Sequence, residues 1–308
     1  MRFALRFLSV AFVLAPLSHI NAQTAPAPAP APVAVPALAA APTAAKNLAM
    51  EFRTMVTTEG MPDTGIIQGH AVGSADKLRM DLTMKGPGAQ VSPLGGSGGE
   101  VSMILSDSGK TVTYLDSRAS HYLRVRPADM LAQAQRSGVK MGFSGTEAKV
   151  DNLGAGPTIL GHPTSHYRIG TGMTMTINAM GQEQVVKISS TSDYYFANDI
   201  KGVVNPFASL SGGDMAAMFG SSSKEFADKM KAMQEKLPKG TPLRASSTST
   251  MIAQGQTRTT NTQAEVTSVQ WVDANPKLFE IPSTYTAVTL PGMAGAQGGA
   301  QGGAIPPR

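Results

Sequence analysis

Apolar and polar residues alternate along much of the chain with the period of two that is typical of β-strands. The clearest case is residues 173–178, where Met173, Met175 and Ile177 alternate with two threonines and an asparagine. A strand of this kind has one apolar and one polar face, as in an antiparallel sheet that is covered on one side. The alternation therefore predicts a mainly β domain.

Two further segments fit the same sheet. Residues 101–105 and 111–115 are rich in β-formers and flank a Ser-Asp-Ser-Gly turn, which predicts a hairpin. Residues 244–262 are rich in threonine and serine and lead into an apolar-polar stretch at residues 265–272. This composition favours antiparallel strands that face solvent.

Helical periodicity is confined to a few places, of which residues 222–237 are the clearest. Ser222 and Glu225 have the spacing of a capping box, and Pro238 ends the pattern. The apolar positions fall on one stripe, namely Phe226, Met230, Met233 and Leu237. Weaker patterns predict helices over residues 128–135 and 214–219. Flexible, polarisable methionines suit a ligand-contacting surface, whereas the amphipathic spacing favours a helix that covers the core of the sheet. The two readings are compatible if the helix lies over a partly open sheet.

The N-terminus has the pattern of a secretory signal peptide over residues 1–22. Arg2 and Arg6 accompany an apolar run at residues 7–17, and Ala22 supplies the small residue before a cut. The run is too short to span a bilayer of ~30 Å as a helix, and no later segment predicts a transmembrane helix. The chain has no cysteine, which excludes disulfides and a lipoprotein anchor. We expect a periplasmic or secreted protein.

Low-complexity segments lie at both ends of the expected domain. Residues 23–45 alternate alanine and proline, which predicts a semi-rigid linker. Residues 291–308 are rich in glycine, alanine and glutamine, which predicts a disordered tail. We expect both to act as spacers, with contact to peptidoglycan or the outer membrane as the alternative. A single β-rich domain is then expected over residues 46–290.

Charge argues against nucleic acid as a partner. The net charge is +5 and the isoelectric point is near 9.4, but lysine and arginine are scattered along the chain. Nucleic-acid binding needs a concentrated basic face with aromatic residues among the charges. That pattern is absent from the sequence.

Signatures of catalysis match only in part. Residues 95–99 have the letters G-x-S-x-G, but a glycine run replaces the strand and helix of a nucleophile elbow. Gly109-Lys110-Thr111 resembles the end of a phosphate-binding loop, yet Ile104 stands where the leading glycine belongs. We therefore predict no catalytic residue and no cofactor.

His162 and His166 raise the question of a metal site. Two histidines four residues apart share one face of a helix, where they can chelate an ion. Gly161 and Pro163 oppose a helix here, and on a strand four residues span about 13 Å. That separation is too large for one zinc ion with Zn–N distances of ~2.0–2.1 Å. We predict no metal site, unless a tight turn at Pro163-Thr164 brings the two rings together.

Four segments together resemble a known family. They are DKLRMDL (residues 76–82), VSMILSDSGKTVTYLDSRASHYLRV (101–125), DNLGAGPTILGHPTSHYRI (151–169) and DANPKLFEIPSTYTAV (273–288). In this order they resemble the uncharacterised secreted bacterial family called domain of unknown function 4412, which is similar to the periplasmic lipoprotein carriers LolA and LolB. The resemblance implies a strongly curved antiparallel half-barrel with a few helices across its concave face. Phe279, Ile281 and Tyr285 are then expected to close the last strand onto the core.

The leading functional hypothesis is a non-catalytic binding or carrier protein for a lipid or other apolar ligand. Candidate ligand-binding residues are Met173, Met175 and Ile177 on the strand and Phe226, Met230 and Met233 on the helix. The alternative is a structural or protein-interaction module of the cell envelope. A hydrolytic enzyme is the least favoured class.

Overall fold

The structure is a computed structural model that describes residues 46–86, 99–107, 110–136, 138–179, 181–201 and 224–289. The predicted signal peptide, the linker, the C-terminal tail, the helix over residues 214–219 and most of the G-x-S-x-G motif lie outside the described residues.

The described chain is mainly β. The strands of its first half are β1 (Lys46–Thr58), β2 (Gly65–Gly73), β3 (Leu78–Lys85), β4 (Glu100–Ser106), β5 (Thr111–Asp116) and β6 (His121–Val125). Those of its second half are β7 (Lys140–Ala155), β8 (Thr164–Ala179), β9 (Gln182–Ala197), β10 (Thr241–Ala253), β11 (Gln256–Asp273) and the short β12 (Thr286–Ala287). The helices are α1 (Pro127–Arg136), α4 (Lys224–Lys236) and the 3-10 turn η2 (Pro276–Phe279). The predicted hairpin and the predicted helices over residues 128–135 and 222–237 are confirmed within these bounds.

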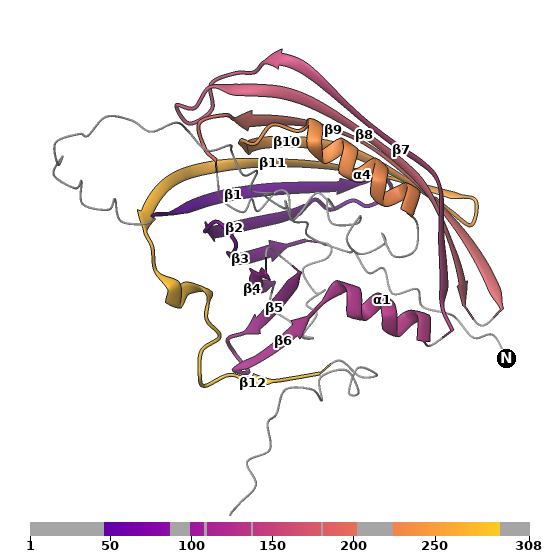
Figure 1. Cartoon of the computed structure of the whole chain (residues 1–308), viewed down its shortest axis with the longest axis horizontal. Coiled ribbons are helices and arrows are strands. Elements are labelled where there is room, and N and C mark those ends of the chain that lie inside the picture. The colour runs from indigo at the N-terminus through magenta and orange to yellow at the C-terminus, as the bar shows by residue number, and fades with distance from the viewer. Residues whose placement is uncertain are drawn as a thin grey trace, which may run out of the picture.

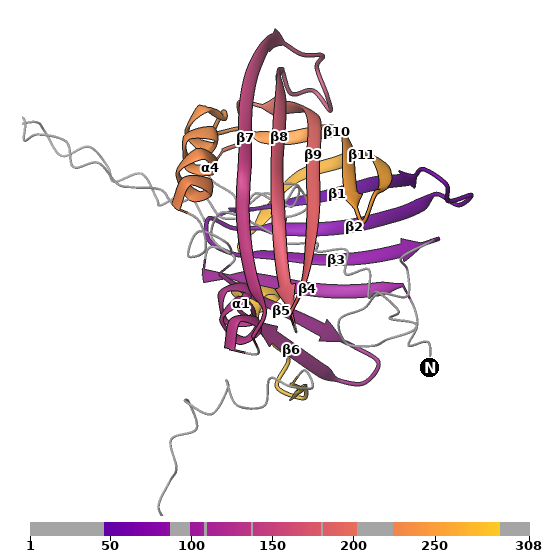
Figure 2. The same ribbon diagram turned by 90° about the vertical axis from the view of Figure 1, so that its right-hand side faces the viewer.

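All twelve strands belong to one sheet that does not close into a barrel. Its order is β12-β6-β5-β4-β3-β2-β1-β11-β10-β9-β8-β7, so β12 and β7 are its edges. The sheet consists of two meanders, β1–β6 and β7–β11, which join where β1 pairs antiparallel with β11. Figures 1 and 2 show the sheet strongly twisted, with β7–β9 running across the direction of β1–β4. The predicted antiparallel pairing holds for every strand pair of the described residues except one, because β12 pairs parallel with β6.

The core lies on one face of the sheet. On β1, Leu48, Met50 and Phe52 are buried, whereas Glu51 and Arg53, on either side of Phe52, are exposed. Directly paired residues share a face, and Met50 pairs with Ala71, which pairs with Met80 on β3. The ring of Phe52 lies over Gly69, where a Cβ atom would collide with it. A glycine is required there because the aromatic ring fills the space.

The C-terminal segment lies against the opposite face. Phe279 and Ile281 line a hollow together with three residues of β4–β6. These three are Ile104, Thr113 and Arg124, which pair directly with one another and point to the face of the sheet opposite the core cluster. The Arg79 guanidinium also donates to the carbonyl of Leu278. The expectation that Phe279, Ile281 and Tyr285 close the last strand onto the core was wrong. All three are half-buried outside the core cluster, because the chain turns through η2 after β11 and crosses the outer surface.

Among the described residues, no helix is both long and apolar enough to cross a membrane.

Candidate functional site

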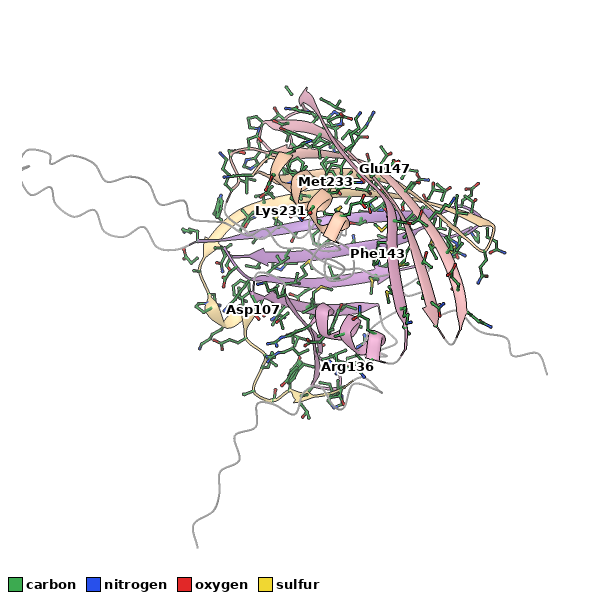
Figure 3. The ribbon with its side chains drawn as sticks, turned by 45° about the vertical axis from the view of Figure 1, so that its right-hand side comes forward. Asp107, Arg136, Phe143, Glu147, Lys231 and Met233 are labelled. Atoms are coloured by element: carbon green, nitrogen blue, oxygen red, sulfur yellow. The ribbon has the colours of Figure 1, made fainter. Side chains whose placement is uncertain are left out.

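Helix α4 packs on the face of the sheet that carries the core. Met230 and Met233 are buried against four side chains of β7 and β8, which are Ala148, Val150, Ile169 and Met173. Directly paired residues share a face, and a row of them leads from the core to this patch. The row consists of Thr54, Ala264, Ala245, Tyr194 and Tyr167. Tyr167 lies two residues before Ile169 on β8, so Ile169 is on the same face as the core. We call this side of the sheet the α4 face. Figure 3 shows Met233 on α4 beside β7, the strand that carries Phe143 and Glu147.

Apolar side chains continue along the α4 face past the helix. Successive rows across the sheet are Met251–Ile188–Met173, Val186–Met175–Phe143 and Ile177–Met141. All of these side chains are half-buried except Met251, which is exposed. We call these three rows the apolar rows. They form one continuous apolar strip on β7–β10.

The structure brings only part of the predicted site together. Met173 contacts the pair Met230 and Met233, as required for a shared site. Met175 and Ile177 lie on the same face of β8 but outside that cluster. Phe226 belongs to α4, and its side chain lies outside the described residues. The assignment of these six residues to a ligand site stays a prediction.

A band of hydroxyl groups separates the apolar rows from the core. We define the hydroxyl band as Ser190, Ser192, Ser247, Ser249, Thr260 and Thr262. The Ser192 hydroxyl donates to Ser247 Oγ over 2.8 Å, and Ser190 Oγ lies 3.2 Å from Ser247 Oγ. Sequence reasoning missed this band, because it assigned the whole Thr/Ser-rich segment to solvent. The signal was present in the alternation, since every second residue of β10 and β11 points to the covered face.

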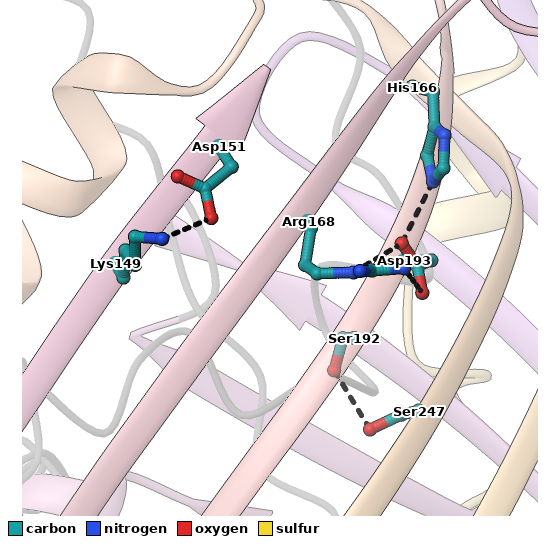
Figure 4. A network of polar contacts seen from close by, with 7 residues as sticks. All are labelled: Lys149, Asp151, His166, Arg168, Ser192, Asp193 and Ser247. Carbon is teal, nitrogen blue, oxygen red and sulfur yellow. Dashed lines mark hydrogen bonds and ion pairs between the residues drawn. The ribbon is translucent and has the colours of Figure 1, made fainter. Parts of the chain in front are cut away.

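The opposite face carries a network of charges around His166 (Figure 4). His166 Nε2 donates to Asp193 Oδ1 over 2.8 Å, and Arg168 donates to both carboxylate oxygens over 3.0 and 3.1 Å. The His166 ring also stacks on Tyr195 with a centroid distance of 4.5 Å. Burial raises the pKa of Asp193, but the hydrogen bonds from Arg168 and His166 outweigh burial, so this pKa lies below its ordinary value.

His162 has a separate partner. Its Nδ1 atom donates to Asp199 Oδ2 over 2.7 Å, and this bond lowers the pKa of Asp199. Ile159 and His162 exchange two backbone hydrogen bonds, because the N–H group of each donates to the carbonyl of the other. The two residues between them, Leu160 and Gly161, both have positive φ. That geometry is a two-residue type I′ turn. β8 then begins at Thr164, and each imidazole is held by its own carboxylate. No cluster of three metal-ligating side chains occurs within the described residues.

Neither of two hollows on the described surface is lined by the six predicted residues. One, of about 710 Å³, lies at the tips of the β8–β9 and β10–β11 hairpins, where its apolar lining is Val185 and Ile252. The other, of about 380 Å³, lies between β4–β6 and the segment after η2.

No protein-family profile matches this chain, and no curated protein matches it. Among solved structures, the chain is similar to a structure of PNGF-II, with 13% identity and a TM-score of 0.33. That alignment covers 79% of this chain and 31% of the other, so this chain spans about a third of that protein. It is also similar to a putative outer membrane lipoprotein-sorting protein domain from Vibrio parahaemolyticus, with 8% identity and a TM-score of 0.26 over 76% of this chain and 89% of that one. Membership of domain of unknown function 4412 stays a prediction.

Proposed function

We propose that this protein is an exported, non-catalytic binding or carrier protein for an apolar ligand, which binds between α4 and the apolar rows. In this proposal the sheet is a half-barrel, and α4 lies across its concave face. The observation that carries the proposal is the alignment of methionine, isoleucine, valine and phenylalanine in three adjacent cross-strand rows.

The composition of the strip supports a ligand surface rather than ordinary packing. Met141, Met173, Met175 and Met251 lie on it, beside Met230 and Met233 of the helix. Methionine is unbranched and flexible, so a surface built from it adapts to chains of different shape. Fully burying an exposed side chain of this size contributes about 1.5–3 kcal/mol, and these half-buried side chains contribute the part of it that corresponds to the area a ligand covers. Several of them are enough for micromolar affinity without any charged contact.

The test is binding of a fluorescent fatty acid by the full mature chain, together with native mass spectrometry of protein from its own host. We expect Met175→Asn to weaken binding roughly tenfold, because one apolar contact is replaced by an amide that must be desolvated. Thr174→Asn is the matched control, since Thr174 is the preceding residue of β8 and faces the other side. Equal affinities for the two variants, or no binding by the parent chain, would contradict the proposal.

An interaction module of the cell envelope is the second candidate. The observation that favours it is the hollow at the hairpin tips, where Val185 and Ile252 are 43% and 40% exposed. This candidate predicts protein crosslinks through those tips in cells and no co-purified lipid. Substituting Val185→Ser would then abolish the crosslinks and leave fatty-acid binding unchanged.

A further inference from the structure

We infer that the ligand is an uncharged amphiphile, a fatty-acyl ester with free hydroxyl groups, whose polar part lies on the hydroxyl band. This inference rests on the proposed function, since it places the acyl chain along the apolar rows. It goes further by assigning the chemistry of the ligand's polar group.

The register arranges the band as two neighbouring rows. One row is Thr262–Ser247–Ser192–Ile169–Val150, and the other is Thr260–Ser249–Ser190–Thr171–Ala148. Both rows end at β7 and β8, where Met230 and Met233 pack against Val150, Ile169 and Ala148. The methionines of α4 therefore form an apolar wall at one end of a polar strip.

The apolar rows begin directly beside the band. From Ser192, in the band, to Val186, in the second apolar row, β9 covers six residues, or about 20 Å. That length accommodates an extended acyl chain. A ligand lying along β9 thus has the hydroxyl groups of Ser192 and Ser190 under one end and the apolar side chains of Ile188 and Val186 under the other.

A buried hydroxyl beside the band has no partner. Thr54 is 4% exposed, and its Oγ1 atom makes no hydrogen bond among the described residues. Thr54 pairs with Ala264, so it is a diagonal neighbour of Thr262 on the same face. An unsatisfied buried hydroxyl costs about 1–3 kcal/mol, which a ligand hydroxyl or carbonyl would recover.

The band carries no charged side chain. Charged residues of the same strands, such as Asp193, Arg244 and Glu265, alternate to the opposite face. Near this face, Arg258 of β11 is exposed and pairs with Met251 in the first apolar row, and the ammonium of Lys229 on α4 is already bound to the Thr146 carbonyl and the Glu225 carboxylate. A carboxylate or ammonium on the band would lose water without gaining a counter-ion. Neutral hydroxyl and ester groups match serine and threonine, which both donate and accept.

Three ligands with the same twelve-carbon chain test the inference, namely monolaurin, laurate and dodecylamine. Each would displace a fluorescent fatty-acid probe from the full mature chain. We expect monolaurin to bind at least tenfold more tightly than the two charged ligands. If laurate binds as tightly as monolaurin, and if Arg258→Gln abolishes the binding of laurate, the inference is wrong and the proposed function still stands. Failure of all three ligands and of the probe to bind would instead contradict the proposed function.

Variants locate the polar group. Ser192→Ala with Ser247→Ala should weaken monolaurin binding about tenfold and leave laurate binding unchanged. The control is Ser189→Ala with Ser246→Ala, on the same strands but the opposite face. Thr54→Val removes the unpartnered hydroxyl without leaving a buried polar atom, so the chain stays folded while monolaurin binds more weakly. A monolaurin affinity that none of these variants changes would overturn the placement on the band.

Discussion

Asp193 is the residue through which the charged face responds to acid. Its carboxylate accepts hydrogen bonds from His166 and from two nitrogen atoms of Arg168, and its pKa lies below the ordinary value. A carboxyl whose pKa is lower in the folded chain binds fewer protons there than in the unfolded chain. Its contribution to stability is therefore present above the unfolded pKa and is lost as the pH falls through the folded pKa.

Asp193→Asn should remove this dependence. We expect the variant to unfold more readily than the parent above about pH 5, with a difference that shrinks as the pH falls below about 4. Chemical denaturation at a series of pH values measures it. Asp63→Asn, at an exposed loop position, is the control and should change little. A deficit for Asp193→Asn that stays constant down to pH 2 would contradict the assignment.

The sequence predicted where the two histidines lie but not what holds them. The glycine and proline around His162 were enough to predict that no helix brings the two imidazoles onto one face. Asp193 and Asp199 lie 27 and 37 residues further along the chain. Pairing at that distance depends on the register of β8 against β9, which local pattern does not specify.

At the scale of elements, helix α4 depends on its two buried methionines. We expect Met233→Ala to destabilise the docked helix by about 2 kcal/mol, because it removes apolar contact and leaves a cavity. Hydrogen exchange of the α4 amides should then speed up while that of β1–β3 stays unchanged. Lys231→Ala, at an exposed position of the same helix, is the control. Equal protection of α4 in both variants would show that Met233 does not hold the helix.

Strand β7 was one of the elements that sequence patterns missed, together with β1, β2 and β9. Its apolar positions change phase, from Met141 and Phe143 to Ala148 and Val150, so no single alternation runs through it. The structure explains the change, because a bulge at Gly145 and Thr146 adds a residue opposite Met173. A bulge reverses which face each later side chain occupies. The helix stripe and the alternation in β8 contain no such interruption, and both were recognised.

For the whole molecule, the open sheet leaves β7 as a long edge. Lys229 of α4 covers part of it, since its ammonium donates to the carbonyl of Thr146 in the bulge over 2.7 Å. Bulges and lysines are common devices against pairing between exposed edges. We expect Lys229→Met to increase concentration-dependent self-association, measured by light scattering. Lys231→Met is the control, with the same change of charge on the same helix, and should stay monodisperse. Scattering that rises equally in both would assign the effect to lost charge.

The pairing of β1 with β11 has a consequence for how quickly the chain reaches its native state. The Lys46 ammonium donates a hydrogen bond to the Asp273 carboxylate, which lies 227 residues further along the chain. The hydroxyls of Thr58 and Thr260, 202 residues apart, also form a hydrogen bond. Each meander pairs strands that follow one another along the chain, whereas their junction requires the closure of a very large loop, and such distant contacts slow folding. We therefore expect the junction to form last. Until it forms, β1 and β11 each present an unpaired edge, and this interval is when the newly made protein is most prone to aggregate.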